Sequence, residues 1–375
     1  MGLDSLVIEG PAKLGPNRLF SDSVPLEPEP LTALSELAVS GVEALHLQAE
    51  LSAAGTARRD YEVLLATFNG ERFLAEQIPS ILEQTVLPQR LLIADDGSTD
   101  KTCDLISAWQ AQSSVPIEVL PAATADRLGS SRNFERLLQA SQAPYVMLAD
   151  QDDIWDRDKA ERLLHQIARL EQCWGTHKPL LVHGDLRLID AEGRCFAASF
   201  HRCQGLNPAR CSTLEIGLQN VVTGCASLLN RACVRQALPF PDQVVLHDWW
   251  LALVAAEAGA IAYLPEACVS YRQHGSNVVG AVGWRRQLMG RLRQVGTSAN
   301  RQPTARQLIS PGLLQLYACL DRFGSAVTPS RLEGLWSRRP WIRLQTAWQL
   351  GLRKHGLWRT LGFYAALWIA KPWKH

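Results

Sequence analysis

The 375-residue sequence carries 38 Lys and Arg against 37 Asp and Glu, and 47% of its residues are hydrophobic, as in an ordinary soluble protein with one large domain or two moderate ones. Its nine Cys form no C-x-x-C pair, which indicates neither a zinc site nor a disulfide framework and favours reduced thiols in the cytoplasm. No apolar run reaches the roughly 18 residues of a membrane-spanning helix, and the acidic N-terminus is unlike a signal peptide.

Residues 1–60 are expected to form an N-terminal extension that is partly disordered or helical. Pro25, Pro28 and Pro30 mark a loose, acidic lead-in, and apolar residues between Leu31 and Leu51 recur at helical spacing. No chemistry is assigned to this segment.

Strands and helices alternate from Tyr61 onward. We expect strands at 61–66, 91–94, 116–120 and 145–149, with helices up to about 84, at 101–112 and at 129–142. This βαβ spacing predicts an α/β fold with a doubly wound parallel sheet and right-handed crossovers. There is no G-x-G-x-x-G after the first strand and no G-x-x-x-x-G-K-[ST] anywhere, so the usual dinucleotide and P-loop interpretations are unsupported.

The strand at 145–149 ends abruptly in three carboxylates, Asp150, Asp152 and Asp153. Ligands of open α/β sheets bind beyond the carboxyl ends of strands, where these acids would lie. The pair Asp150 and Asp152 offers hard oxygen ligands that suit Mg²⁺ or Mn²⁺ bridging a diphosphate. The alternative is a solvated acidic loop that caps the next helix through Asp156 or Asp158.

The elements beyond this turn are less regular. We expect a helix at 159–173, a strand within 180–189, an irregular acceptor-side segment at 194–217, and an apolar strand at 220–230 that is broken by Gly224. A helix opens at 245–250 and runs to about 258, before a short strand near 261–264.

Charged residues gather at several of these element ends. Asp95 and Asp96 end one strand, the three carboxylates end another, and Asp248 opens a helix. Each has a structural explanation by itself, because Asp-Gly is a favoured turn, Asp is a good N-cap, and His274 alone is typical of a surface histidine. Four such features at one sheet edge favour a single site.

A series of short motifs follows in order between residues 61 and 280: Leu64-Leu-Ala-Thr-Phe-Asn-Gly-Glu, Gln77 to Gln84-Thr85, Ala94-Asp-Asp-Gly-Ser-Thr-Asp, and Asp150-Gln-Asp-Asp-Ile-Trp. The set resembles the family 2 glycosyltransferases of GT-A fold. His247-Asp-Trp-Trp-Leu and Tyr271-Arg-Gln-His-Gly-Ser-Asn resemble a bacterial subgroup described as rhamnosyltransferases. The resemblance implies a GT-A type doubly wound, mostly parallel sheet flanked by helices.

The resemblance also implies how a nucleotide would be held. Asp96 would accept a hydrogen bond from a uracil- or thymine-type base, in a pocket lined by Ala66 and Phe68. Asp150 and Asp152 would form a D-x-D motif that binds the diphosphate and Mg²⁺ or Mn²⁺, with Asp152 as the direct metal ligand.

Further matched positions would carry the chemistry and the acceptor. His274 would complete the metal or diphosphate site, and Asp248 would be the catalytic base. The opposing carboxylate takes the proton of the acceptor hydroxyl, and one displacement with one base inverts the anomeric centre. The candidate acceptor contacts are Trp249, Trp250, Gly224 and Asp185, and the candidates near the diphosphate are Arg132 and Asn133. Packing beneath the helix is the alternative for one of the two Trp, and an ordinary surface position is the alternative for Arg132 and Asn133.

The tail differs from the body in charge. From Arg285 onward 16 Lys and Arg stand against two acids, and half of the 12 Trp lie between Trp336 and Trp373, both included. A helical face with Trp341, Leu344, Trp348 and Leu352, surrounded by basic residues that include Arg343, would suit the headgroup layer of a membrane. The alternative is a helix packed on the catalytic domain. Nucleic-acid binding is disfavoured because no recognised module accompanies the charge.

The sequence therefore predicts an N-terminal extension at 1–60, a catalytic domain at 61–284 and a basic, helical, membrane-peripheral tail at 285–375. The predicted enzyme is cytoplasmic, lies on the inner face of the membrane, and transfers a sugar from dTDP-rhamnose or a UDP-hexose to a lipid-linked or growing polysaccharide. The alternatives are a sugar nucleotidyltransferase, which would release pyrophosphate, and a catalytically silent glycan-binding scaffold.

Overall fold

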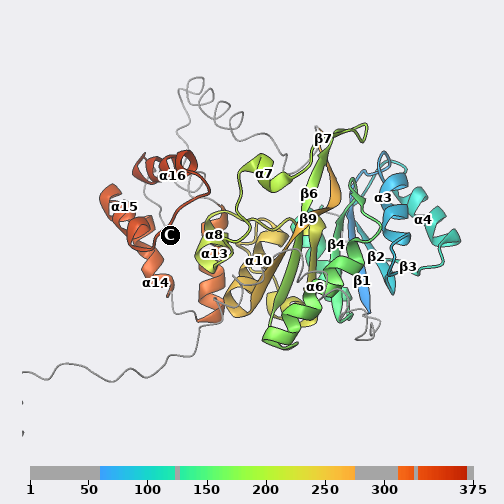
Figure 1. Ribbon diagram of the computed structural model, residues 1–375, viewed down its shortest axis with the longest axis horizontal. Coiled ribbons are helices and arrows are strands. Elements are labelled where there is room, and N and C mark those ends of the chain that lie inside the picture. The colour runs from blue at the N-terminus through green and yellow to red at the C-terminus, as the bar shows by residue number, and fades with distance from the viewer. Residues whose placement is uncertain (1–59, 123–126, 275–310, 325–327, 370–375) are drawn as a thin grey trace, which may run out of the picture. The chain divides into compact units, whose positions relative to one another are not determined.

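The computed structural model describes residues 60–122, 127–274, 311–324 and 328–369 (Figure 1). The predicted N-terminal extension with its helix from Leu31 to Leu51 and the first part of the predicted tail, residues 285–310, lie outside the described residues. None of the helices in the described ranges is long and apolar enough to cross a membrane.

Four parallel strands form the first half of one sheet, in the order β3-β2-β1-β4. They are β1 (Tyr61–Thr67), β2 (Arg90–Asp95), β3 (Ile117–Val119) and β4 (Tyr145–Asp150). Residues 63–65 of β1 are fully buried, which agrees with the apolar run that predicted a strand covered on both faces. The register places Ala66 of β1 beside Ala94 and beside Asp150, so the carboxyl ends of three strands meet at one edge.

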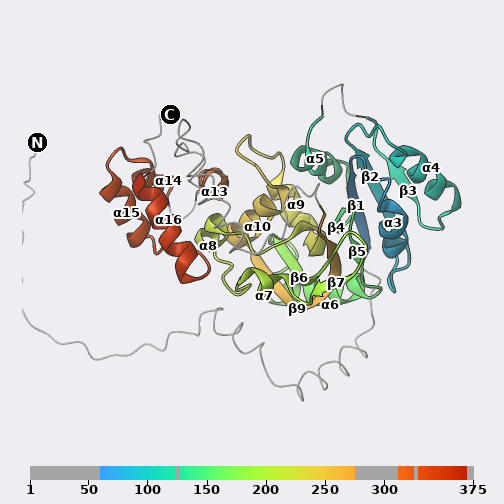
Figure 2. The same cartoon turned by 90° about the horizontal axis from the view of Figure 1, so that it is seen from above.

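Helices cover both faces of this sheet (Figure 2). The helices α3 (Leu74–Leu82), α4 (Thr102–Gln112) and α6 (Lys159–Trp174) pack on one face, and α5 (Ser130–Ala140) and α10 (His247–Ala258) pack on the other. The side chains of β1 divide accordingly, because Leu64 joins the cluster that contains Phe134 of α5, and Leu65 joins the cluster that contains Ile78 of α3. The predicted doubly wound α/β fold is confirmed.

The second half of the sheet is mixed. β8 (Ser227–Asn230) pairs antiparallel with β4 and with β6 (Leu180–Ile189), and β6 runs parallel to β9 (Ala260–Arg272). The short strands β5 (Ile154–Trp155) and β7 (Cys195–Ala197) add antiparallel pairings to β9 and β6. The longest pairings are parallel, so the expectation of a mostly parallel sheet holds.

Two segments differ from the sequence-based expectation. Residues 194–217, which were expected to be irregular, contain β7, α7 (Phe200–Gln204) and α8 (Thr213–Leu218). The strand expected at 220–230 forms only from Ser227, because a 3₁₀ turn, η2 (Gly224–Ala226), precedes it. The N–H of Gly224 donates to the Asp248 carboxylate at 3.2 Å, which draws this stretch toward α10.

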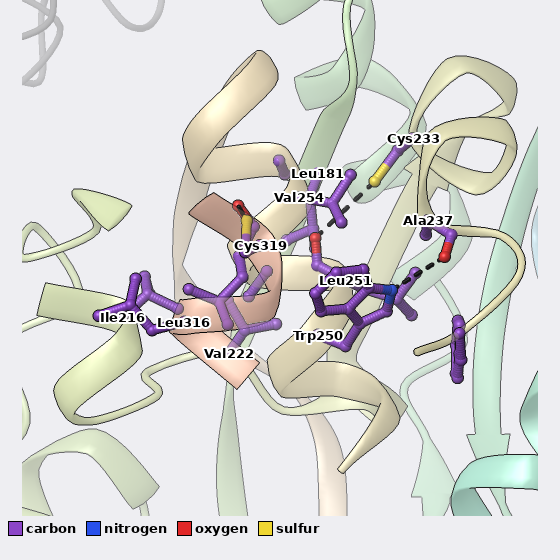
Figure 3. Close-up of a cluster of buried hydrophobic side chains, with 14 of the residues drawn as sticks. Leu181, Ile216, Val222, Cys233, Ala237, Trp250, Leu251, Val254, Leu316 and Cys319 are labelled. Carbon is purple, nitrogen blue, oxygen red and sulfur yellow. Dashed lines mark hydrogen bonds between the residues drawn. The ribbon is translucent and has the colours of Figure 1, made fainter. Parts of the chain in front are cut away.

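The described part of the tail is helical. It consists of α13 (Pro311–Phe323), α14 (Pro329–Leu332), the 3₁₀ turn η3 (Glu333–Trp336), α15 (Pro340–Gln349) and α16 (Leu357–Ile369). α13 packs against α8 and α10, with Leu316 and Cys319 fully buried in the same cluster as Ile216 (Figure 3). For α13, therefore, the alternative of a helix packed on the preceding domain is the one observed.

The face predicted for the tail is only partly at the surface. Trp341 and Trp348 of α15 are exposed, whereas Leu352 lies beyond the end of α15 and is buried. Arg343 was expected among the basic residues around a face in the membrane headgroup layer, but it is buried and donates a hydrogen bond to the Trp368 carbonyl at 3.0 Å. The predicted helical spacing continued past the end of α15, which explains the error at Leu352.

Gly312 in the first turn of α13 lies where a Cβ does not fit. A Cβ there would lie 2.1 Å from Cζ2 of Trp249 and 2.3 Å from the carbonyl oxygen of Gly217. We expect Gly312→Ala to displace α13 and lower the free energy of unfolding by about 1–3 kcal/mol, measured by urea denaturation. At Gly362 in α16 a Cβ would meet nothing within 4 Å, so Gly362→Ala is the control and should stabilise by up to about 1 kcal/mol. Equal destabilisation of both variants would contradict a specific close contact at Gly312.

Candidate active site

The candidate residues of β1, β2 and β4 meet at the carboxyl edge of the sheet. Phe68 follows β1, Asp96 follows β2, and Asp150 ends β4 beside Ala66 of β1. The structure therefore brings together the residues predicted to line a nucleotide pocket and those predicted to hold a metal. Parallel register produces this proximity, because each of the strands ends at the same level.

Asp95 and Asp96 have different partners although they are neighbours. Asp95 accepts hydrogen bonds from the N–H groups of Gly97 and Ser98 at 3.1 and 2.7 Å, which is the turn role that was its structural alternative. The two oxygens of Asp96 accept from the N–H groups of Leu128 and Gly129, each at 2.8 Å. A carboxylate oxygen has two lone-pair directions, so Asp96 retains acceptor capacity for a further donor.

Arg127 covers the predicted base pocket. Its guanidinium carbon lies 3.3 Å from the centroid of the Phe68 ring, and its Nε lies 3.8 Å from Oδ2 of Asp96. A cation over an aromatic face is stabilising. A base that stacks on this face of Phe68 has to take the place of the guanidinium.

Gln151, between the two acids of the D-x-D, was missed as a site residue. Its side-chain amide pairs with both main-chain groups of Phe68, accepting from the N–H at 2.7 Å and donating to the carbonyl at 2.9 Å. A Cβ at Gly70 would lie 2.5 Å from Oε1 of Gln151, so the glycine leaves room for the side chain. The ends of β1 and β4 are thereby joined. The motif quoted for the resemblance contained Gln151, but nothing in the sequence identified its partner.

The acidic loop itself divides into two groups. Oδ2 of Asp152 lies 2.7 Å from Nε2 of His274, as the predicted pairing of these two residues at one site requires. Asp150, Asp153 and Cys225 form a second group, in which one ligand atom from each lies within 4.8 Å of the others. Oδ2 of Asp153 is buried and has no hydrogen-bond partner within the described ranges.

Burial and neighbouring carboxylates raise the pKa of two acids in the loop. Burial, followed by the charges of Asp152 and Asp248, raises the pKa of Asp150 to about 7. Burial raises the pKa of Asp153 well above its usual range, and Asp152 and Asp150 add to that increase. The ammonium of Lys159 partly offsets this charge from inside the protein, where it donates to the Cys225 carbonyl at 2.6 Å and faces the Trp155 ring.

This donor set fits a divalent cation. Carboxylate oxygens are the ligands that Mg²⁺ and Mn²⁺ prefer, whereas the Cys225 thiol is soft and burial raises its pKa, so it is a poor ligand for either ion. Oδ2 of Asp153 has no hydrogen-bond partner among the described residues. Burial and neighbouring carboxylates disfavour the ionised form of Asp150, and a bound cation would offset that effect.

Asp248 lies on the second residue of α10. The helix N-cap is Leu246, so the alternative that Asp248 serves as the N-cap is not observed. Oδ2 accepts from the Gly224 N–H at 3.2 Å, and Oδ1 is buried without a partner among the residues described. Burial raises the pKa of Asp248 to about 6, and the negative charge of Asp248 contributes to the raised pKa of Asp150. A carboxylate with a pKa near neutrality and an open oxygen is suited to accept a proton.

The candidate acceptor contacts divide. Trp250 is fully buried and donates to the Ala237 carbonyl at 2.9 Å (Figure 3), so its prediction as an acceptor contact is wrong and the packing alternative holds. Trp249 is half-buried, donates to the Ile216 carbonyl at 2.6 Å and packs on Gly312.

Asp185 and Gly224 have structural partners of their own. Asp185 binds His201 and Ser199, and although burial opposes it, these hydrogen bonds lower the pKa of Asp185 to about 2. The backbone of Gly224 holds Asp248, as described above.

The two candidates near the diphosphate also have structural partners. Asn133 is buried and donates to the Ala94 carbonyl at 2.7 Å, so its side chain does not reach a diphosphate. Arg132 pairs with Glu135 at 2.6 Å and with Asp242 at 3.1 Å. Asn133 therefore supports the end of β2, and Arg132 supports the segment before α10.

Comparison with known proteins identifies a family match and several similar proteins. Residues 62–177 match the family described as Glycosyl transferase family 2. The dTDP-rhamnosyl transferase RfbG of Shigella flexneri is 28% identical over 224 residues, which cover 58% of this chain and 74% of RfbG. An uncharacterized glycosyltransferase of Nostoc is 29% identical over 57% of this chain, and the match spans 65% of that relative's length. Among solved structures, Staphylococcus aureus TarS 1–349 in complex with UDP is similar with a TM-score of 0.46 at 14% identity, over 82% of this chain and 90% of that one.

The ionised Asp150 is expected to cost stability when no cation is bound. Its pKa in the folded protein is above that of an unfolded Asp, so the folded state binds the proton more tightly and stability falls as pH rises from about 4 to 7. In the presence of a chelator, Asp150→Asn should therefore raise the free energy of unfolding at pH 8 by about 1–2 kcal/mol and change it little at pH 5, measured by thermal and urea denaturation.

Asp190 provides a control of opposite sign. Hydrogen bonds from Arg194 lower the pKa of this exposed carboxyl, so Asp190→Asn should slightly destabilise the protein at pH 8. A gain for Asp150→Asn that is equal at pH 5 and pH 8 would mean that ionisation of Asp150 is not its origin.

Proposed function

This chain belongs to the family 2 glycosyltransferases, and we propose that it is a metal-dependent, inverting enzyme that transfers a sugar from a nucleoside-diphosphate donor to a hydroxyl of a glycan acceptor. The observation that carries the proposal is that carboxylates with three distinct positions lie at one edge of the sheet. Asp96 lies beside Phe68, Asp150 and Asp152 lie in the loop after β4, and Asp248 faces them from α10 with its pKa raised to about 6.

Each group has a distinct part in this proposal. Asp96 receives the base N–H with Ala66 and Phe68 alongside, and Asp150, Asp152 and His274 hold the diphosphate and a Mg²⁺ or Mn²⁺ ion. A divalent cation in this position supplies positive charge that stabilises the departing nucleoside diphosphate. Asp248 takes the proton from the acceptor hydroxyl as its oxygen attacks the anomeric carbon. One displacement with one base inverts that centre.

The donor is proposed to be dTDP-rhamnose or a UDP-hexose. The support is the 28% identity to a dTDP-rhamnosyl transferase and the match of residues 62–177 to Glycosyl transferase family 2. The acceptor is proposed to be a lipid-linked or growing polysaccharide of the cell envelope, such as an O-antigen. Trp249 and the backbone at Gly224 lie next to Asp248. We propose that they contact the acceptor at this position.

Nucleotide binding and transfer should respond differently to two substitutions. We expect dTDP or UDP, but not GDP, CDP or NAD, to raise the melting temperature of the wild type only with Mn²⁺, by the equivalent of about 2.7 kcal/mol at 100 times Kd. Asp152→Ala should abolish this shift. Asp248→Asn should retain it and lose sugar transfer, measured as release of nucleoside diphosphate, because only the proton acceptor has been removed.

Several outcomes would contradict the proposal. Equal loss of nucleotide binding in both variants would contradict the separate roles of Asp152 and Asp248. Release of pyrophosphate would indicate a nucleotidyltransferase. The absence of a shift with any nucleoside diphosphate at millimolar concentration would favour a silent glycan-binding scaffold.

We also propose that α16 holds the enzyme against the inner face of an anionic membrane. The outward face of α16 is apolar and carries Leu357, Trp358, Leu361, Trp368 and Ile369, each at least half exposed. Residues 340–369 contain no Asp or Glu, and the exposed Arg353 lies just before α16. An apolar face with Trp and basic neighbours suits the interface of an anionic bilayer.

Removal of two aromatic side chains tests this surface. The double variant Trp358→Ser with Trp368→Ser should weaken co-sedimentation with phosphatidylglycerol vesicles by about tenfold or more, because each side chain contributes at least about 1 kcal/mol of burial. Phe196→Ser is the control, since Phe196 of β7 is 57% exposed outside the tail. Unchanged sedimentation would mean that this face does not bind the membrane. If the wild type is a dimer and the double variant a monomer, the face is a dimer interface instead.

A further inference from the structure

Arg272, the last residue of β9, is buried against the acidic loop although its side chain is one of the largest in the protein. It is 1% exposed, and its guanidinium carbon lies 4.8 Å from the centroid of the Phe73 ring. A fully buried Arg is costly unless its donors are bound. The partners of Arg272 therefore indicate what its burial accomplishes.

The guanidinium donates to three separate segments. Nε donates to the main-chain carbonyl of Asp152 at 2.9 Å, one terminal nitrogen donates to the Ala191 carbonyl at 3.1 Å, and the other pairs with the Glu76 carboxylate at 2.9 Å. The planar fork of Arg suits such a junction, because its donors are fixed in direction relative to one another. The loop after β4, the turn after β6 and α3 are thus joined at one side chain.

The backbone around Arg272 contacts the same loop. The Arg272 N–H donates to Oδ1 of Asp153 at 3.1 Å, and His274, two residues further on, meets Oδ2 of Asp152 at 2.7 Å. Asp152 is therefore held at its carbonyl by Arg272 and at one carboxylate oxygen by His274. Groups that orient a ligand residue in this way typically affect metal affinity as well as geometry.

We infer that Arg272 is a positioning residue that orients Asp152 toward a bound divalent cation. The inference rests on the proposed function, because it assumes that Asp152 is a metal ligand. Arg272 contacts neither substrate nor reacting atoms in this role.

The test compares Arg272→Lys with Arg187→Lys. Arg187 of β6 is a matched control, because it forms a bidentate ion pair with Asp156, which lies beyond the carboxylate loop. Its Nη1 donates to Oδ1 of Asp156, and its Nη2 donates to Oδ2 at 2.8 Å. Mn²⁺ affinity is measured from the signal of free Mn²⁺ in electron paramagnetic resonance, with saturating UDP or dTDP. Arg272→Lys should weaken Mn²⁺ binding by about 10- to 100-fold, and Arg187→Lys should leave it unchanged although both lose stability.

The outcomes separate this inference from the function on which it rests. If the wild type binds Mn²⁺ and Arg272→Lys binds it equally well, Arg272 does not position Asp152 and the proposed function stands. If the wild type does not bind Mn²⁺, both the proposed metal site and the inference are wrong. If both Lys variants weaken binding alike, the effect is general loss of structure and the inference is again overturned.

A second variant applies if Arg272→Lys does not fold. Glu76→Ala removes the half-exposed carboxylate that fixes the far end of the guanidinium and leaves Arg272 in place. It should weaken Mn²⁺ binding by about threefold or more, since the fork is held less firmly. Wild-type affinity in Glu76→Ala would then overturn the inference.

Discussion

The site depends on the mutual repulsion of the carboxylates in the loop after β4 and on how the protein contains it. Ligand atoms of Asp150 and Asp153 lie within 4.8 Å of each other. Burial and neighbouring carboxylates raise the pKa of both, and the buried Lys159 interacts electrostatically with both. Like charges at this density would separate in a flexible loop. The loop therefore has to be fixed by contacts other than those of its carboxylates.

Several of those contacts are made to the main chain of the loop and its surroundings. Gln77 donates to the Asp150 carbonyl at 2.7 Å, and Arg272 donates to the Asp152 carbonyl at 2.9 Å. Gln151 binds the backbone of Phe68, and Lys159 binds the Cys225 carbonyl. Because the backbone carries the restraint, carboxylate oxygens such as that of Asp153 are left for a ligand. A site arranged in this way does not have to reorganise when positive charge arrives.

The sequence predicted the fold well because the parallel strands are buried on both faces. Their apolar runs identified β1, β2 and β4, and the shared edge of parallel strands predicted that Asp96, Asp150 and Asp152 would meet. Hydrophobic pattern reports burial but not partners, so Gln151 and Arg272 gave no signal of their contacts. It also does not distinguish an aromatic residue that lines a site from one that packs beneath it, which is why Trp250 was misassigned. The short elements between 194 and 217 depend on local caps such as Ser212 with Glu215, which fix helices too short for a periodic pattern.

The carboxylates of this protein differ in role because they differ in hydrogen bonding rather than in type. Asp185 accepts hydrogen bonds from Ser199 and from His201, and these hold its pKa at about 2, so it stays ionised and serves structure. Among the described residues, Asp248 accepts only backbone hydrogen bonds, among them one from the Gly224 N–H at 3.2 Å, and burial outweighs them and raises its pKa to about 6, so it can gain and lose a proton near neutrality. Supplying Asp248 with further donors would stabilise its ionised form and weaken it as a proton acceptor. The feature that separates a base from a structural acid is thus the balance between burial and hydrogen bonding, since Asp248 lacks, within the described ranges, the side-chain donors that outweigh burial at Asp185.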